Sequence, residues 1–123
     1  MCDSFGEFVR EKRKARKISV RQFATQVDIS FVYQSCIERG ERSAPSYEIL
    51  LKIADALYLD KDETSRLLDL ASKTKSVPMV SYDLAEYVNS NQKVHECIRM
   101  SKNNGIPQSE WNEFLEHLKS KYK

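Results

Sequence analysis

The residues of this chain that could take part in binding chemistry are mainly cations near its N-terminus. The stretch "REKRKARK", residues 10–17, holds six basic side chains and one glutamate. Lys and Arg side chains bind a phosphate backbone by displacing its condensed counterions. The same run could equally form the solvated face of a helix. The first 45 residues carry nine basic and six acidic groups, so the excess positive charge lies in the N-terminal part of the chain.

The sequence shows none of the patterns that are typical of an enzyme. It contains no glycine-rich phosphate loop, no H-E-x-x-H pair and no nucleophile elbow. Neighbouring carboxylates such as Glu110 and Glu113 fit a solvated helix surface. The spacing of the cysteines and histidines fits neither a set of disulfide bonds nor a zinc site. They are Cys2, Cys36, Cys97, His95 and His117. We therefore expect no enzyme activity, no cofactor and no metal.

The expected compartment follows from the same composition. Three widely spaced cysteines suit a reducing cytoplasm. No run of about 18 apolar residues predicts a membrane span, and the first residues do not resemble a secretion signal. We expect a cytoplasmic protein with no membrane partner.

Apolar residues recur at spacings of three and four along nearly the whole chain, which predicts an all-α fold. Helices are expected over about 4–16, 19–27 and 30–39, followed by two more that begin near Pro45 and Asp60. Residues 74–81 read as a linker containing Pro78. Three short helical segments follow, with a loop at "NNGIPQ", residues 103–108.

The short helix, turn and short helix over residues 19–39 suggest a helix-turn-helix, in which the second helix enters the major groove of DNA. If Ile37 belongs to the core, residues 34, 37 and 38 face inward and residues 31, 32, 35, 36 and 39 face outward. Phe31 and Val32 then head the exposed face. Apolar side chains there can contact the C5-methyl group of thymine. Alternatively, both could pack against a partner protein or the C-terminal tail.

Four stretches carry a resemblance to a known family. They are "ISVRQFA" (18–24), "IERGER" (37–42), "PSYEILLKIADAL" (45–57) and "LDKDE" (59–63). In this order, the chain from Phe5 to about Ala71 resembles the XRE (Cro/C1-type) helix-turn-helix family of transcriptional regulators. The resemblance implies a compact five-helix, lambda-repressor-like domain that works as a dimer on a palindromic operator. It also implies a structural ion pair between Arg13 and Glu38.

Three residues depart from the usual family pattern, and one of them, Tyr33, matches a branch of the family that carries tyrosine at this place. Asp28 stands where many members have glycine in the turn; Asp tolerates the left-handed conformation better than most residues. Gln34 stands where a bulky aliphatic side chain is usual. A buried Gln must find a hydrogen-bond partner or cost about 1–3 kcal/mol.

The residues predicted to contact double-stranded DNA combine the outward face of the third helix with helix caps and nearby arginines. Arginines are expected on phosphates, which hold register without reading sequence. The predicted set is Ser19, Arg21, Ser30, Phe31, Val32, Ser35, Cys36, Arg39 and Arg42.

The chain is expected to divide into a DNA-binding domain, residues 1–75, and a helical C-terminal extension, residues 76–123. The apolar residues of the last helix need burial. They are Trp111, Phe114, Leu115 and Leu118. We expect them to form a homodimer interface or to bind a regulatory protein, although they could also pack back on the chain's own first domain.

Taken together, the sequence predicts a sequence-specific DNA-binding regulator, and more specifically a repressor. A protein-interaction module on the same fold, of the antitoxin or anti-repressor type, is the alternative. DNA binding through several phosphates weakens steeply as salt rises from about 50 to 200 mM, whereas apolar protein docking does not.

Overall fold

The computed structural model describes residues 4–77 and 79–122, so Cys2 and Pro78 lie outside the described residues. The described chain is all-α and contains no strand. Its helices are α1 (Phe5–Ala15), α2 (Val20–Val27), α3 (Phe31–Glu38), α4 (Tyr47–Ala56), α5 (Lys61–Ser72), α6 (Tyr82–Ser90), α7 (Gln92–Asn104) and α8 (Gln108–Lys121). None of the described helices is long and apolar enough to cross a membrane.

Local sequence signals begin these helices. The Ser19 side chain accepts a hydrogen bond from the backbone N–H of Gln22, and the Gln22 side-chain oxygen accepts one from the backbone N–H of Ser19. The expected capping box therefore forms. Asp60 and Glu63 make the same reciprocal pair at the start of α5. Such caps satisfy N–H groups that a helix start leaves without partners. The predictions of these two helix starts are confirmed.

The turn between α2 and α3 uses the conformation expected of it. Asp28 caps the end of α2 with φ 63° and ψ 46°, in the left-handed region. Ser30 follows in extended backbone, and its side chain accepts from the Tyr33 N–H at 3.0 Å. Asp at the place of the usual glycine therefore keeps the turn.

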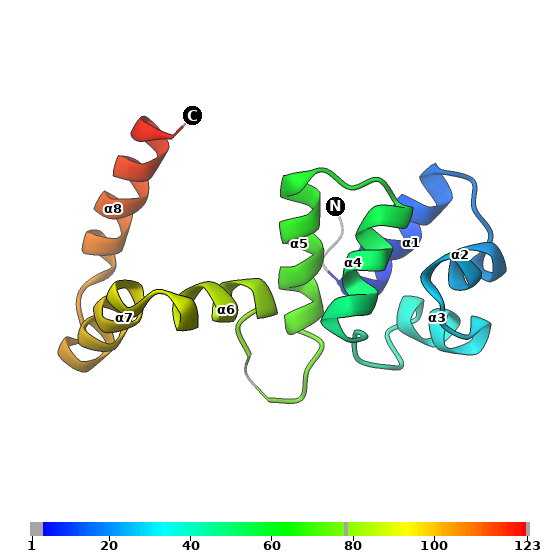
Figure 1. Cartoon of the computed structure of the whole chain (residues 1–123), viewed down its shortest axis with the longest axis horizontal. Coiled ribbons are helices and arrows are strands. Elements are labelled where there is room, and N and C mark those ends of the chain that lie inside the picture. Colours follow the sequence, from blue (N-terminus) through cyan, green and yellow to red (C-terminus); the bar gives the residue numbers. More distant parts are fainter. Residues whose placement is uncertain (1–3, 78, 123) are drawn as a thin grey trace. The chain divides into compact units, whose positions relative to one another are not determined.

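The chain separates into two compact units, Met1–Ala85 and Glu86–Lys123. In the first, α1 to α5 gather around one hydrophobic core (Figure 1). The most deeply buried side chains come from all five of these helices. They include Phe5, Val9, Phe23, Val27, Ile37, Ile53 and Leu67. Apolar burial of this kind is the main force that holds such a domain together.

Helices α1 and α3 approach unusually closely. A Cβ added to Gly6 would lie 2.6 Å from the carbonyl oxygens of both Ile37 and Glu38. No side chain fits at that distance, so glycine is required there by space. The contact fixes the C-terminal end of α3 directly against α1.

The segment after α5 also lies on the first unit. The hydroxyl oxygen of Thr74 accepts from the Ala44 N–H at 2.8 Å, and Lys75 donates to the Ala44 carbonyl at 2.8 Å. The rings of Tyr47 and Tyr82 stack with centroids 4.5 Å apart. The beginning of α6 therefore belongs to the compact unit that contains α4.

In the second unit, α7 runs further than expected. The loop predicted at 103–108 is wrong at its edges, because α7 continues to Asn104 and α8 starts at Gln108. Gly105 ends α7 with φ 55°, a left-handed cap that lets the helix extend up to it. Trp111, Phe114 and Leu115 on α8 are exposed.

Candidate nucleic-acid interface

Helix α3 has one face sealed into the core and one face open. Gln34 is 0% exposed, Ile37 1% and Glu38 6%. Phe31 and Val32 at its start are exposed at 38% and 67%. Ser35 and Cys36 are half-buried, and Arg39 is exposed. The inward face predicted for this helix is therefore confirmed, and so is the exposure of residues 31, 32 and 39, whereas residues 35 and 36 are only partly exposed.

A buried ion pair ties α3 to α1. Arg13 Nε lies 2.8 Å from Glu38 Oε2, and Arg13 Nη2 lies 2.9 Å from Glu38 Oε1. Arg13 Nη1 also donates to the Ile18 carbonyl at 2.8 Å. The fork of a guanidinium matches a carboxylate in this two-bond arrangement. Arg13 thus serves the fold and is not available to DNA.

The buried side-chain amide of Gln34 has a hydrogen-bond partner for its nitrogen but none for its oxygen. Its Nε2 donates to Glu38 Oε2 at 2.7 Å, which adds a third donor to the same carboxylate. Its Oε1 is the only buried side-chain oxygen or nitrogen of the described residues that lacks a hydrogen-bond partner. The family's aliphatic position is therefore filled here by a polar bridge within α3.

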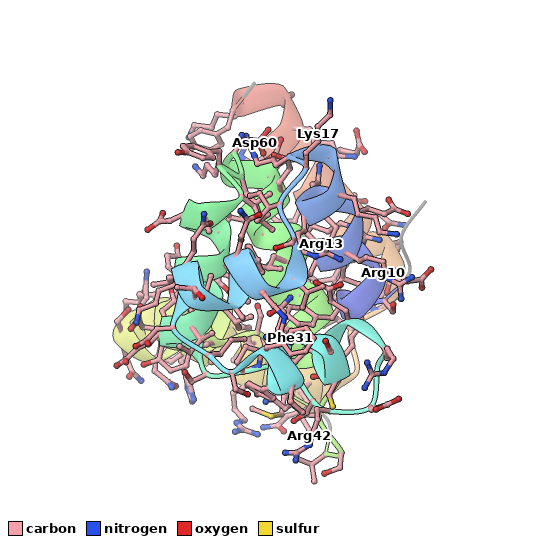
Figure 2. All side chains as sticks on the ribbon, turned by 90° about the vertical axis from the view of Figure 1, so that its right-hand side faces the viewer. Arg10, Arg13, Lys17, Phe31, Arg42 and Asp60 are labelled. Carbon is pink, nitrogen blue, oxygen red and sulfur yellow. The ribbon has the colours of Figure 1, made fainter. Side chains whose placement is uncertain are left out.

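Arg21 and Phe31 form a contact that the sequence did not indicate. The Arg21 guanidinium carbon lies 4.1 Å from the centroid of the Phe31 ring. Figure 2 labels Phe31 beside the junction of α2 and α3. A cation over an aromatic face at this distance is attracted by the negative potential of the ring. The residue predicted for a phosphate and the residue predicted for a base are thus in contact.

Arg39 forms an exposed ion pair with Glu41, two residues further along the chain. Its Nε and Nη2 lie 3.0 Å and 3.1 Å from the two carboxylate oxygens of Glu41. Its Nη2 is 3.7 Å from Cys36 Sγ. Hydrogen bonding and charge attraction from Arg39 hold the pKa of Glu41 below its ordinary value. Sequence reasoning missed this pair, although a glutamate two residues from an exposed arginine was the available signal.

The basic run at residues 10–17 is largely used by the domain. Beyond Arg13, Lys12 pairs with Glu63, and Arg16 donates to the Leu57 carbonyl at 2.9 Å while lying over the Tyr58 ring. Figure 2 places Lys17 at the opposite end of the view from Arg42, with Phe31 between them. The run is therefore no continuous phosphate surface beside α3.

The remaining predicted contact residues fall into two groups. Ser19 and Ser30 are exposed helix caps whose side-chain oxygens accept from backbone N–H groups. Arg42 is exposed beyond Gly40, which has φ 77°.

Among the described residues no group of three or more His, Cys, Asp or Glu side chains could hold a metal ion.

Residues 4–67 match a family profile described as a helix-turn-helix domain. The chain belongs to the XRE-type helix-turn-helix family. It is similar to the HTH-type transcriptional repressor RghR of Bacillus subtilis, with 42% identity over 57 residues that span 46% of this chain and 42% of the relative. It is 31% identical over 101 residues to RghRB of the same organism, an uncharacterized HTH-type transcriptional regulator, across 82% of this chain and 68% of that protein.

A relative from a second organism matches a similar share of the chain. An uncharacterized HTH-type transcriptional regulator of Mycobacterium tuberculosis is 36% identical over 76 residues, spanning 52% of this chain and 54% of that relative. The chain thus spans about half the length of the first relatives it matches. A solved structure of a SinR protein/SinI protein complex matches with a TM-score of 0.50 at 21% identity, over 95% of this chain and 96% of the other. That likeness concerns the fold alone.

Proposed function

We propose that this protein is a DNA-binding transcriptional repressor that inserts the open face of α3 into the major groove. One observation carries the proposal most directly. The inward face of α3 is held by the Arg13–Glu38 pair and by Gln34, while Val32 at its start is 67% exposed. A rigid helix with an open face is what groove reading needs. The similarity to a protein named a transcriptional repressor supports the same conclusion.

In this proposal the groove is read largely through apolar contact. Val32 carries two methyl groups, which suit the C5-methyl of thymine. Ser35 can donate to a base or a phosphate. Arg21 and Arg42 supply phosphate contacts on either side, and Arg39 joins them if DNA displaces Glu41. Readout of this kind uses few paired hydrogen bonds, so DNA shape contributes to the preference.

The proposal includes a homodimer on a palindromic operator. Trp111, Phe114 and Leu115 are 40%, 52% and 48% exposed, and Leu118 is half-buried. Exposed apolar groups grouped on one helix favour association. A dimer would present two α3 helices to half-sites about 34–36 Å apart. A regulatory protein that docks on the same exposed apolar side chains is a further proposed partner.

Selection of bound duplexes from a random pool tests the DNA-binding part. The expected result is enrichment of a two-fold symmetric site whose affinity falls at least tenfold between about 50 and 200 mM salt. Failure to enrich any duplex at low salt would contradict the proposal. Apolar docking to protein without salt dependence would instead support the interaction-module alternative.

Sedimentation of the full chain tests the dimer. Trp111→Ala combined with Phe114→Ala should shift the protein toward monomer and weaken binding to the two-fold site much more than to a half-site. Glu113→Gln, an exposed change on the same helix, serves as the control. The proposed homodimer would be contradicted if the wild-type protein were monomeric and still bound the full two-fold site much more tightly than a half-site.

A further inference from the structure

The Arg21–Phe31 contact gives Phe31 a role different from base reading. The guanidinium lies over the ring at 4.1 Å, so one face of the ring is already occupied. Phe31 is 38% exposed, against 67% for the neighbouring Val32. A covered ring has less surface to offer a thymine methyl group than an open valine.

The same contact leaves the donors of Arg21 available. A guanidinium stacked on a ring uses its face, and its N–H groups point outward from its edge. Among the described residues no carboxylate pairs with Arg21, whereas Arg13 and Arg39 are each bound in two-bond pairs to glutamates. Arg21 is therefore held in place without being neutralised.

We propose that Phe31 is a positioning residue that holds Arg21 for a DNA phosphate, which leaves Val32 as the main apolar base reader. This inference rests on the proposed function. Arg21 is the second residue of α2, and the first helix of a helix-turn-helix crosses the DNA backbone. A guanidinium that is already ordered loses less side-chain freedom when it binds a phosphate. Phe31 then raises affinity for every sequence alike.

A double-mutant cycle on the full-length protein provides the test. Phe31→Leu should weaken binding to selected and unrelated duplexes equally, by about twofold to fivefold. Arg21→Ala should weaken both and lower the slope of log affinity against log salt by about one. In the Arg21→Ala background, Phe31→Leu should cause no further loss. Phe31→Tyr keeps the ring and should keep the affinity.

Val32→Ala is the matched control, because Val32 is the next residue on α3. Its effect should be specific to particular base pairs and additive with Arg21→Ala. Additive effects of Phe31→Leu and Arg21→Ala, or a changed base preference in Phe31→Leu, would overturn the inference while leaving the proposed function intact.

A measurement without DNA separates the two proposals further. In free wild-type protein, the side-chain protons of Arg21 should show ring-current shifts in NMR spectra that disappear in Phe31→Leu. Absence of these shifts overturns the stacking itself. If the shifts are present and no duplex binds, the proposed function fails, and the phosphate role of Arg21 fails with it.

Discussion

The amide of Gln34 donates to the carboxylate of Glu38 across 2.7 Å inside the core, while its own Oε1 has no partner among the described residues. The same Glu38 carboxylate binds Arg13 on α1. One polar cluster therefore joins the seat of α3 to the first helix. It also contains a polar atom whose loss of hydration is not offset.

Replacing Gln34 by leucine should raise or preserve stability. The change removes the unpaired oxygen and fills the position with the aliphatic side chain typical of the family. We expect the free energy of unfolding to change by about 0 to +1 kcal/mol, measured by urea denaturation. Gln26→Leu on the exposed face of α2 is the control and should change little. A loss above about 2 kcal/mol for Gln34→Leu would show that the bridge to Glu38 outweighs the unpaired oxygen.

Breaking the Arg13–Glu38 pair should be strongly destabilising. Arg13→Ala leaves the Glu38 carboxylate buried with one donor fewer on each oxygen, and removal of one partner of a buried pair costs about 3–5 kcal/mol. Arg39→Ala breaks an exposed pair and should have little effect on stability. Thermal unfolding should give a much lower melting temperature for Arg13→Ala than for Arg39→Ala. Similar melting temperatures for the two variants would contradict the structural role of Arg13.

Glycine at position 28 should stabilise the turn. Asp28 has φ 63°, a conformation that glycine adopts without the cost imposed by a Cβ. We expect Asp28→Gly to raise the free energy of unfolding by up to about 1 kcal/mol. Asp28→Ala retains the Cβ and loses the polar side chain, so it should not be stabilising. The prediction is wrong if chemical denaturation ranks alanine at or above glycine.

Acid should lower the folding stability of the first unit, because it protonates Glu63. The hydrogen bond from Lys12, then one from the Asp60 backbone, holds the pKa of Glu63 below its ordinary value of 4.5. A lowered pKa in the folded state means that the unfolded chain takes up the proton more readily. The contribution is therefore complete above about pH 4.5 and is lost as pH falls through the folded pKa. Glu63→Gln keeps the capping box and should flatten the fall in melting temperature between pH 5 and pH 3.

Freeing Arg39 should strengthen DNA binding. Glu41→Gln removes the carboxylate that accepts hydrogen bonds from Nε and Nη2 of Arg39. Affinity for all duplexes should rise, and the salt slope should steepen by about one as another cation reaches phosphate. Glu113→Gln changes the net charge equally on α8, in the second unit, and should have a smaller effect. Equal gains from both variants would attribute the effect to net charge alone.

The helix starts were predictable because they depend on neighbours in sequence. Ser19 with Gln22 and Asp60 with Glu63 specify capping boxes within four residues. Gln34 could be placed inward from the spacing to Ile37, but its acceptor on Glu38 depends on rotamers set by packing. The Arg21–Phe31 stack joins two helices across a turn, so its formation depends on the crossing of α2 and α3. No local pattern encodes that geometry.

The most direct test of the account compares the sites selected by wild-type protein and by Val32→Ala from the same random pool. We predict that the wild type enriches a defined site and that the variant loses preference at one thymine position in each half-site while keeping the rest. Identical preferences for the two proteins would contradict base reading by the open face of α3.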